Sequence, residues 1–175
     1  MIAMTLEEYL ERGGEAWFLT GKRAHRMQAM MVSRETSFHN ALDVADYTVA
    51  DDGVTVILKG RYGEMYATGL PNVVSAYTKP DGGALSEADF AEKDAYIDIV
   101  AREKPGSYCA MHVPPDVCVT VVTAGGNVLH TNRPNAPHGD GDYLVCRADE
   151  RGEPDLTDIW VLNGVAFPEY YFAKM

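Results

Sequence analysis

The chain has 175 residues, which is enough to bury a core in one domain or in two small subdomains. Of these residues 46% are hydrophobic and 23% charged, which is ordinary for a globular protein. The formal net charge of −11 at pH 7 repels phosphates at long range, so we expect no nonspecific binding to nucleic acid or to an anionic membrane. Such acidity suits solubility or a basic protein partner.

The N-terminus and the cysteines bear on location. The opening stretch, MIAMTLEEYL, has no basic segment followed by an apolar run. No apolar run approaches the roughly 20 residues of a membrane span. Cys109, Cys118 and Cys146 are odd in number and too few for a disulfide framework. We therefore expect a cytoplasmic protein without membrane contact, whose thiols are free and buried.

The first half predicts short elements. Thr5 and Glu8 form a capping-box pattern, which predicts a short helix within an N-terminal extension over residues 1–21. GKRAHR, residues 21–26, is the only dense basic cluster; it is either an exposed turn or a patch that holds a phosphate or an acidic partner. Runs such as DYTVADDGVTVILKG predict antiparallel strands joined by tight turns over residues 22–80.

A long helix is predicted in the connecting segment, residues 81–105. Ser86 can cap it, Phe90 and Ile97 lie on one helical face, and Pro105 stops it. We expect its apolar stripe to face the core and the helix to join the two halves.

The second half, residues 106–175, again reads as short strands and repeats parts of the first half in the same order. We interpret this as a diverged tandem duplication, which should superpose around Asp46 and Asp142. The predicted fold class is therefore α+β: two related small antiparallel β subdomains with short helices, joined by the longer helix, in one compact domain. The matches are AMMV at 29–32 with AMHV at 110–113, DYTV at 46–49 with DYLV at 142–145, Tyr66 with Trp160, and NVVSAY at 72–77 with VAFPEYY at 165–171.

The stretch HGDGDYLVCR, residues 138–147, raises the question of a metal loop. His138, Asp140 and Asp142 supply donor atoms but not the full set that a hard cation needs. The pattern C-x2-H-x5-C at 109–118 lacks the second close pair of a zinc site. We interpret the stretch as a turn that enters a strand, and we expect no metal and no cofactor.

The polar loop HTNRPNAPHGDGD, residues 130–142, is the strongest candidate for a binding site. It is long and inserted relative to the first half, and such loops on a rigid scaffold often carry function. Arg133 can hold a phosphate or carboxylate with two hydrogen bonds, with His130 or His138 as donor or base. The alternative is a solvent-exposed loop without a ligand. The candidate ligand-binding residues are His130, Asn132, Arg133, His138 and Asp140.

The second half also resembles a known family. Gly141-Asp142-Tyr143, followed by Phe167 and Tyr171, is similar to the PGDYG family of small domains from bacteria and phages. Asp140 stands where that family has its proline, and the first half matches more weakly. The resemblance implies a phage or mobile-element origin and carries no catalytic mechanism.

Three functional classes stay open. The first is a non-catalytic interaction module that acts on a basic host protein, its acidity imitating nucleic acid. The second is a small-molecule binder, for example of a nucleotide, that uses loop 130–142. The third is a hydrolase or transferase with a histidine or cysteine, although no G-x-S-x-G elbow, P-loop or H-E-x-x-H occurs. We expect the first class.

Overall fold

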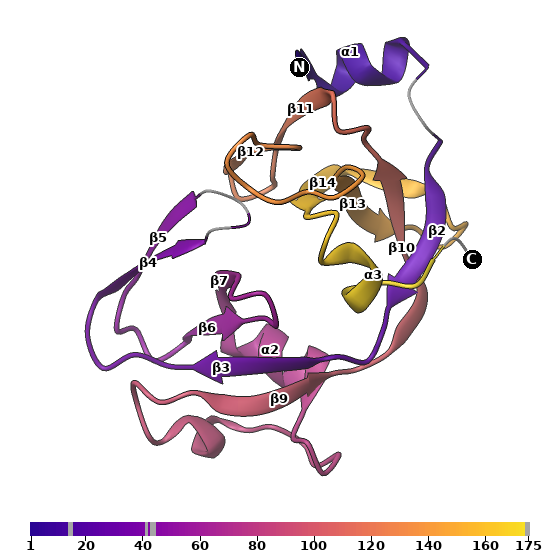
Figure 1. Ribbon diagram of the computed structural model, residues 1–175. Helices are drawn as coiled ribbons and strands as arrows, with labels where there is room; N and C mark the ends of the chain where they lie inside the picture. Colours follow the sequence, from indigo (N-terminus) through magenta and orange to yellow (C-terminus); the bar gives the residue numbers. More distant parts are fainter. Residues whose placement is uncertain (14–15, 41, 43–44, 174–175) are drawn as a thin grey trace. The chain divides into compact units, whose positions relative to one another are not determined.

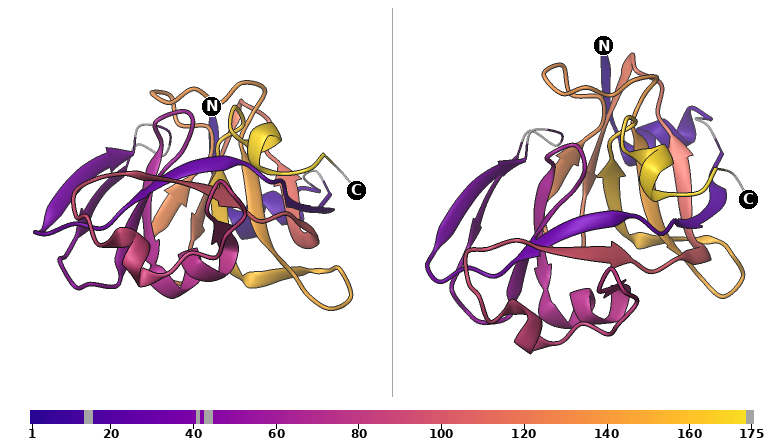
Figure 2. Two further views of the ribbon diagram at one scale, coloured as in Figure 1. Left: turned by 90° about the horizontal axis from the view of Figure 1, so that it is seen from below. Right: turned by 60° about the horizontal axis from the view of Figure 1, so that its bottom comes forward.

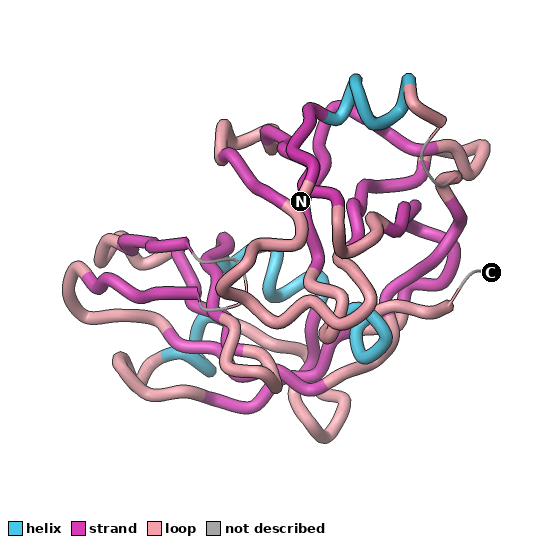
Figure 3. The backbone as a smooth tube through the Cα atoms, turned by 45° about the horizontal axis from the view of Figure 1, so that its top comes forward, coloured by secondary structure: helices cyan, strands magenta, loops and turns pink. Residues whose placement is uncertain are grey.

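A computed structural model describes residues 1–13, 16–40, 42 and 45–173. The chain is mostly β strand, in mainly antiparallel sheets with a few short helices (Figure 3). It divides into two compact units: unit 1 comprises Met1–Arg23 and Glu103–Met175, and unit 2 comprises Ala24–Arg102. Unit 2 is therefore an insertion in the chain of unit 1. Among the described residues, no helix has the length and hydropathy needed to cross a membrane.

Unit 1 contains two sheets (Figure 1). The larger has the order β14-β13-β10-β2, and the smaller has the order β1-β11-β12, with β1 parallel to β11. The capping box of Thr5 and Glu8 is confirmed at the start of the short helix α1. The elements of unit 1 are β1 (Ile2–Thr5), α1 (Leu6–Glu11), β2 (Phe18–Lys22), β10 (Lys104–His112), β11 (Val117–Val122), β12 (Val128–His130), β13 (Tyr143–Ala148), β14 (Pro154–Leu162) and α3 (Phe167–Tyr170).

Successive side chains of a strand point to opposite faces of a sheet, and in the large sheet of unit 1 both faces carry apolar side chains. One face joins the core that it shares with the small sheet, where Met111, Val119 and Leu144 are fully buried. The other face carries aromatic rings under α3, and Tyr143 stacks on Phe167 with ring centroids 3.8 Å apart.

Unit 2 contains a five-stranded sheet with the order β7-β6-β3-β9-β8 and a separate two-stranded sheet of β4 and β5 (Figure 2). A small core of Val32, Val49 and Ile57 packs inside it. The elements of unit 2 are β3 (Arg26–Met30), β4 (Thr36–Asn40), β5 (Ala45–Val49), β6 (Thr55–Lys59), β7 (Met65–Gly69), α2 (Leu70–Ala76), β8 (Tyr77–Thr78), the 3-10 helix η1 (Glu87–Phe90) and β9 (Ile97–Ala101).

The long helix predicted within residues 81–105 is wrong. Ser86 does cap a helix, with a capping box to Asp89, but that helix is the single 3-10 turn η1. Residues Ile97–Ala101 form β9, which pairs with β3. Burial along β9 follows period two, since Ile99 and Ala101 are buried whereas Asp98 is exposed and Val100 half-buried. The segment up to Arg102 thus belongs to unit 2 and does not connect two halves.

The predicted equivalence of Asp46 and Asp142 is also wrong. Asp46 lies inside β5, which pairs only with β4 in the two-stranded sheet. Asp142 precedes β13, which lies between β10 and β14 in the large sheet of unit 1. The shared Asp-Tyr-x-Val pattern is short, and it suits the beginning of many strands.

Candidate functional site

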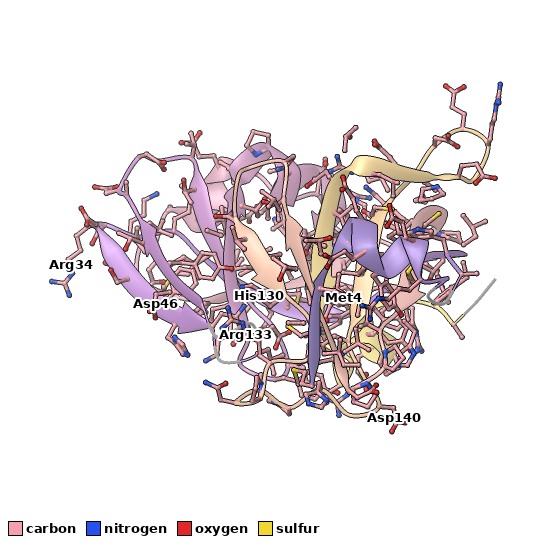
Figure 4. All side chains as sticks on the ribbon, turned by 90° about the horizontal axis from the view of Figure 1, so that it is seen from above. Met4, Arg34, Asp46, His130, Arg133 and Asp140 are labelled. Carbon is pink, nitrogen blue, oxygen red and sulfur yellow. The ribbon has the colours of Figure 1, made fainter. Side chains whose placement is uncertain are left out.

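The predicted site residues lie on the loop that leaves β12 at His130 and enters β13 at Tyr143. The loop brings some of them together and separates others. His130 and Arg133 lie close together, whereas Asp140 lies away from both (Figure 4). The predicted set is therefore not one site.

Asn132 is a structural residue of this loop. It is fully buried, with a left-handed backbone at φ 52°. Its side-chain Nδ2 donates to the carbonyl oxygens of Val113 (3.1 Å), Pro114 (2.8 Å) and Val117 (2.8 Å). Its Oδ1 accepts from the backbone N–H of Asp142 at 2.7 Å. These bonds use the amide group, so Asn132 is not available to a ligand.

Asp142 forms the reciprocal half of this hydrogen-bond pair with Asn132. Its carboxylate accepts the backbone N–H groups of Asn132 (2.7 Å) and Gly164 (2.8 Å). Burial raises the pKa of this carboxyl group, and the two N–H bonds oppose that rise. Gly141 has φ 122°, and a Cβ there would lie 2.1 Å from the carbonyl oxygen of Val113. The glycine and aspartate of HGDGDYLVCR therefore build a turn, as the sequence predicted.

The contacts of His138 and Asp140 among the described residues involve groups other than His130 and Arg133. Nδ1 of His138 lies 3.4 Å from the carbonyl oxygen of Gly139. The Asp140 side chain is exposed, and its backbone oxygen lies 2.9 Å from Nε2 of His112. Neither predicted residue adds a group to His130 and Arg133.

His130 and Arg133 form the part of the loop with unused binding capacity. His130 lies directly across from Thr120 of β11, and its Nδ1 is 2.8 Å from the Thr120 hydroxyl. Burial, and then the charge of Arg133, lowers the pKa of His130, so the imidazole is neutral at pH 7. Nε of Arg133 is buried and has no hydrogen-bond partner among the described residues.

Sequence reasoning missed Thr120 and considered Cys118 only as a free thiol and as part of an incomplete zinc pattern. Both alternate along β11 with Val119 and Val121, which point into the core, so both share the opposite face with His130. The signal was present in the run VCVTVVT, but the partner of Thr120 follows only from the pairing of β11 with β12. We name Thr120, His130 and Arg133 the hairpin site.

The thiols do not suit nucleophilic catalysis. All three cysteines are free, and Cys109 and Cys146 are buried. Burial raises the pKa of Cys109 and of Cys118, and it raises the pKa of Cys146 to about 12. The reactive thiolate is therefore scarce at neutral pH. Within the part of the chain that the structure describes, His, Cys, Asp and Glu side chains do not gather in threes around a metal position.

Comparisons with protein-family models, with curated proteins and with solved structures each found no match. The similarity of Gly141-Asp142-Tyr143 to the PGDYG family therefore stays a prediction.

Proposed function

We propose that the protein is a non-catalytic binding module that holds the carboxylate of a small ligand at Arg133. The observation that carries this proposal is the buried Nε of Arg133 without a partner. Leaving a buried donor unpaired costs about 1–3 kcal/mol, and an acceptor on a ligand would recover that free energy. A planar guanidinium matches a carboxylate with two parallel hydrogen bonds.

The state of His130 indicates that the proposed carboxylate ligand is a monoanion. Its ring is oriented by the Thr120 hydroxyl at Nδ1, and when that hydroxyl donates, Nε2 carries the proton and can donate to a ligand. Since the pKa of His130 is lowered, Arg133 supplies the only full positive charge of the hairpin site. A monoanion is thus a better match than a dianion.

Replacing Arg133 with methionine should abolish ligand-induced stabilisation without unfolding the protein. The wild-type Tm should rise with at least one member of a panel of mono- and dicarboxylates, because a ligand that binds the folded state stabilises it. Arg133→Met removes the unpaired Nε and keeps an apolar stem, so its Tm without ligand should not fall. Differential scanning fluorimetry measures both quantities.

The matched control is Arg151→Met, which changes an exposed arginine of unit 1 in the β13–β14 turn. This variant should keep the ligand response. If Arg133→Met responds like the wild type, or if no carboxylate shifts the wild-type Tm, the hairpin site does not bind carboxylates.

We propose a basic protein partner as the second candidate, at the tip of the β13–β14 hairpin. Leu156, the third residue of β14, is 49% exposed, and four exposed acidic side chains together with exposed Arg151 lie within the seven residues before it. Those side chains are Asp149, Glu150, Glu153 and Asp155. An apolar contact with an acidic rim suits a basic protein surface. Binding should weaken as salt rises; salt-independent binding to a basic target would contradict this proposal.

We also propose that the two units are diverged copies of one ancestral unit. Matching residues lie in the same register across each large sheet, which supports two of the four sequence matches. The row across unit 2 is Tyr66, Leu58, Ala29 and Ile97, and the row across unit 1 is Trp160, Val145, Ala110 and Phe18.

The elements that follow these rows agree as well. Pro71 stands at the start of α2 and Pro168 at the start of α3. The tyrosine after α2 pairs with β9, and Tyr171 after α3 pairs with β2. Each unit then carries an inserted hairpin at the same point, β4–β5 in one and β11–β12 in the other. The proposed duplication thus supplies the scaffold, and the β11–β12 insertion supplies the hairpin site.

A further inference from the structure

Three cationic residues of unit 1 lie toward one end of its large sheet, on the neighbouring strands β2, β10 and β13. Lys22 ends β2 and lies directly across from Lys104, which begins β10. Arg147 of β13 pairs with Tyr108 of β10. Lys104 and Arg147 both act on the charge of Lys22, so the three positive groups share one region. We name Lys22, Lys104 and Arg147 the cation cluster.

The ammonium of Lys22 lies against aromatic rings. Its Nζ is 5.6 Å from the ring centroid of Tyr108. Tyr108 makes edge contacts with Trp160 at 6.1 Å and with Tyr171 at 5.6 Å. Tyr108 and Tyr171 are buried, so this side of the ammonium faces rings and not water. The ring face offsets part of the desolvation of the charge.

No described carboxylate pairs with Lys22. Burial, then Lys104 and Arg147, lowers its pKa to about 8. Asp155 interacts with the charge of Arg147, but its carboxylate already accepts hydrogen bonds from the N–H and the hydroxyl of Thr157. A largely buried cation among other cations is unfavourable unless an anion completes the site. This arrangement is unexpected in a chain whose net charge is −11.

We propose that the cation cluster binds the phosphate group of a ligand. Three donors on three neighbouring strands match the oxygens of a tetrahedral dianion better than they match one planar carboxylate. Lysine acts on phosphate as a point charge, and the guanidinium of Arg147 can bond two of its oxygens. This proposal goes beyond the hairpin site, because it involves other residues and a ligand of higher charge.

Isothermal titration calorimetry of the full chain with inorganic phosphate tests this proposal. Lys22→Met and Arg147→Gln should each weaken phosphate binding at least about tenfold, the usual effect of losing a hydrogen bond to a charged group. Lys59→Met is the matched control, because Lys59 also lies over a tyrosine ring, with its Nζ 5.5 Å from the centroid of Tyr96. Lys59→Met should bind phosphate like the wild type.

Proton uptake gives a second readout at pH 8.5. A bound anion raises the pKa of Lys22, so wild-type binding should take up protons, measured as a dependence of the heat on the buffer's ionisation enthalpy. Lys104, Arg147, Tyr108, Tyr171 and Asp155 are the other titratable groups around the cluster. Lys22→Met should lose this uptake.

Two further ligands separate the outcomes. A phosphomonoester should compete with phosphate, which identifies the dianionic group as the part recognised, and chloride at equal ionic strength should not compete. Absence of phosphate binding to the folded wild type, equal affinity in Lys22→Met, or displacement by chloride would each overturn the proposal. Absence of carboxylate binding to the wild-type protein, with phosphate binding intact, would overturn only the proposed function of the hairpin site.

Discussion

Replacing Asn132 with alanine should lower the free energy of unfolding by about 3–5 kcal/mol. The substitution removes the hydrogen bonds of the Asn132 amide to the carbonyl oxygens of Val113, Pro114 and Val117 and to the N–H of Asp142, which are buried or partly buried. It also puts alanine at φ 52°, where a residue other than glycine, asparagine or aspartate is strained. Urea unfolding followed by circular dichroism measures the change.

Two controls separate the causes of this loss. Asn132→Gly removes the same hydrogen bonds but relieves the backbone, so it should be less destabilising than alanine by about 1 kcal/mol. Asn135→Ala changes an exposed asparagine of the same loop and should be nearly neutral. If Asn132→Ala were as stable as Asn135→Ala, the hydrogen bonds between Asn132 and Asp142 would not stabilise the loop.

Replacing Lys22 with methionine should raise the free energy of unfolding at pH 7 by roughly 1–3 kcal/mol. The folded protein holds this lysine at a pKa of about 8, against an ordinary value of 10.5, mainly because burial disfavours the charge. Methionine keeps an unbranched apolar stem and removes the charge. A gain in stability together with a loss of phosphate binding is the pattern expected of a residue retained for function.

The gain from Lys22→Met should depend on pH in a defined direction. Below pH 8 the lysine is charged in both the folded and unfolded chains, so the full destabilisation is present. Between pH 8 and 10.5 the unfolded chain binds more protons, so wild-type stability rises and the gap to the variant closes. Parallel urea titrations at pH 7 and 9.5 test this; a constant gap would contradict the lowered pKa. Lys59→Met should show no such gain.

Local patterns could be predicted from the sequence, and pairings between distant strands could not. The capping box of Thr5 and Glu8 needs four neighbouring residues, and it was predicted correctly. The segment around Ile97 fits both a helical and a strand period, and pairing with β3 decides between them. The match of Asp46 with Asp142 failed because two residues are structurally equivalent only if their strands hold the same place in the sheet, and a similar local sequence does not ensure this.

The candidate site shows the same limit. Loop 130–142 stood out by length and polarity, and Arg133 with His130 is the pair in this loop that we propose to bind a ligand. Asn132 looked like a ligand-binding residue because its identity does not reveal that its amide is buried and fully bonded. The cation cluster was visible only as GKRAHR, because Lys104 joins Lys22 through strand register.

The insertion of unit 2 into unit 1 determines the order in which the protein can fold during synthesis. The strands of unit 2 all lie between Ala24 and Arg102, so its sheet can pair as soon as that segment has left the ribosome. β2 emerges before them, but its partner β10 begins only at Lys104. The edge strand β2 of the large sheet in unit 1 therefore stays unpaired until all of unit 2 has been synthesised. A chaperone, or a neighbouring chain on the same polysome, would bind this unpaired strand first.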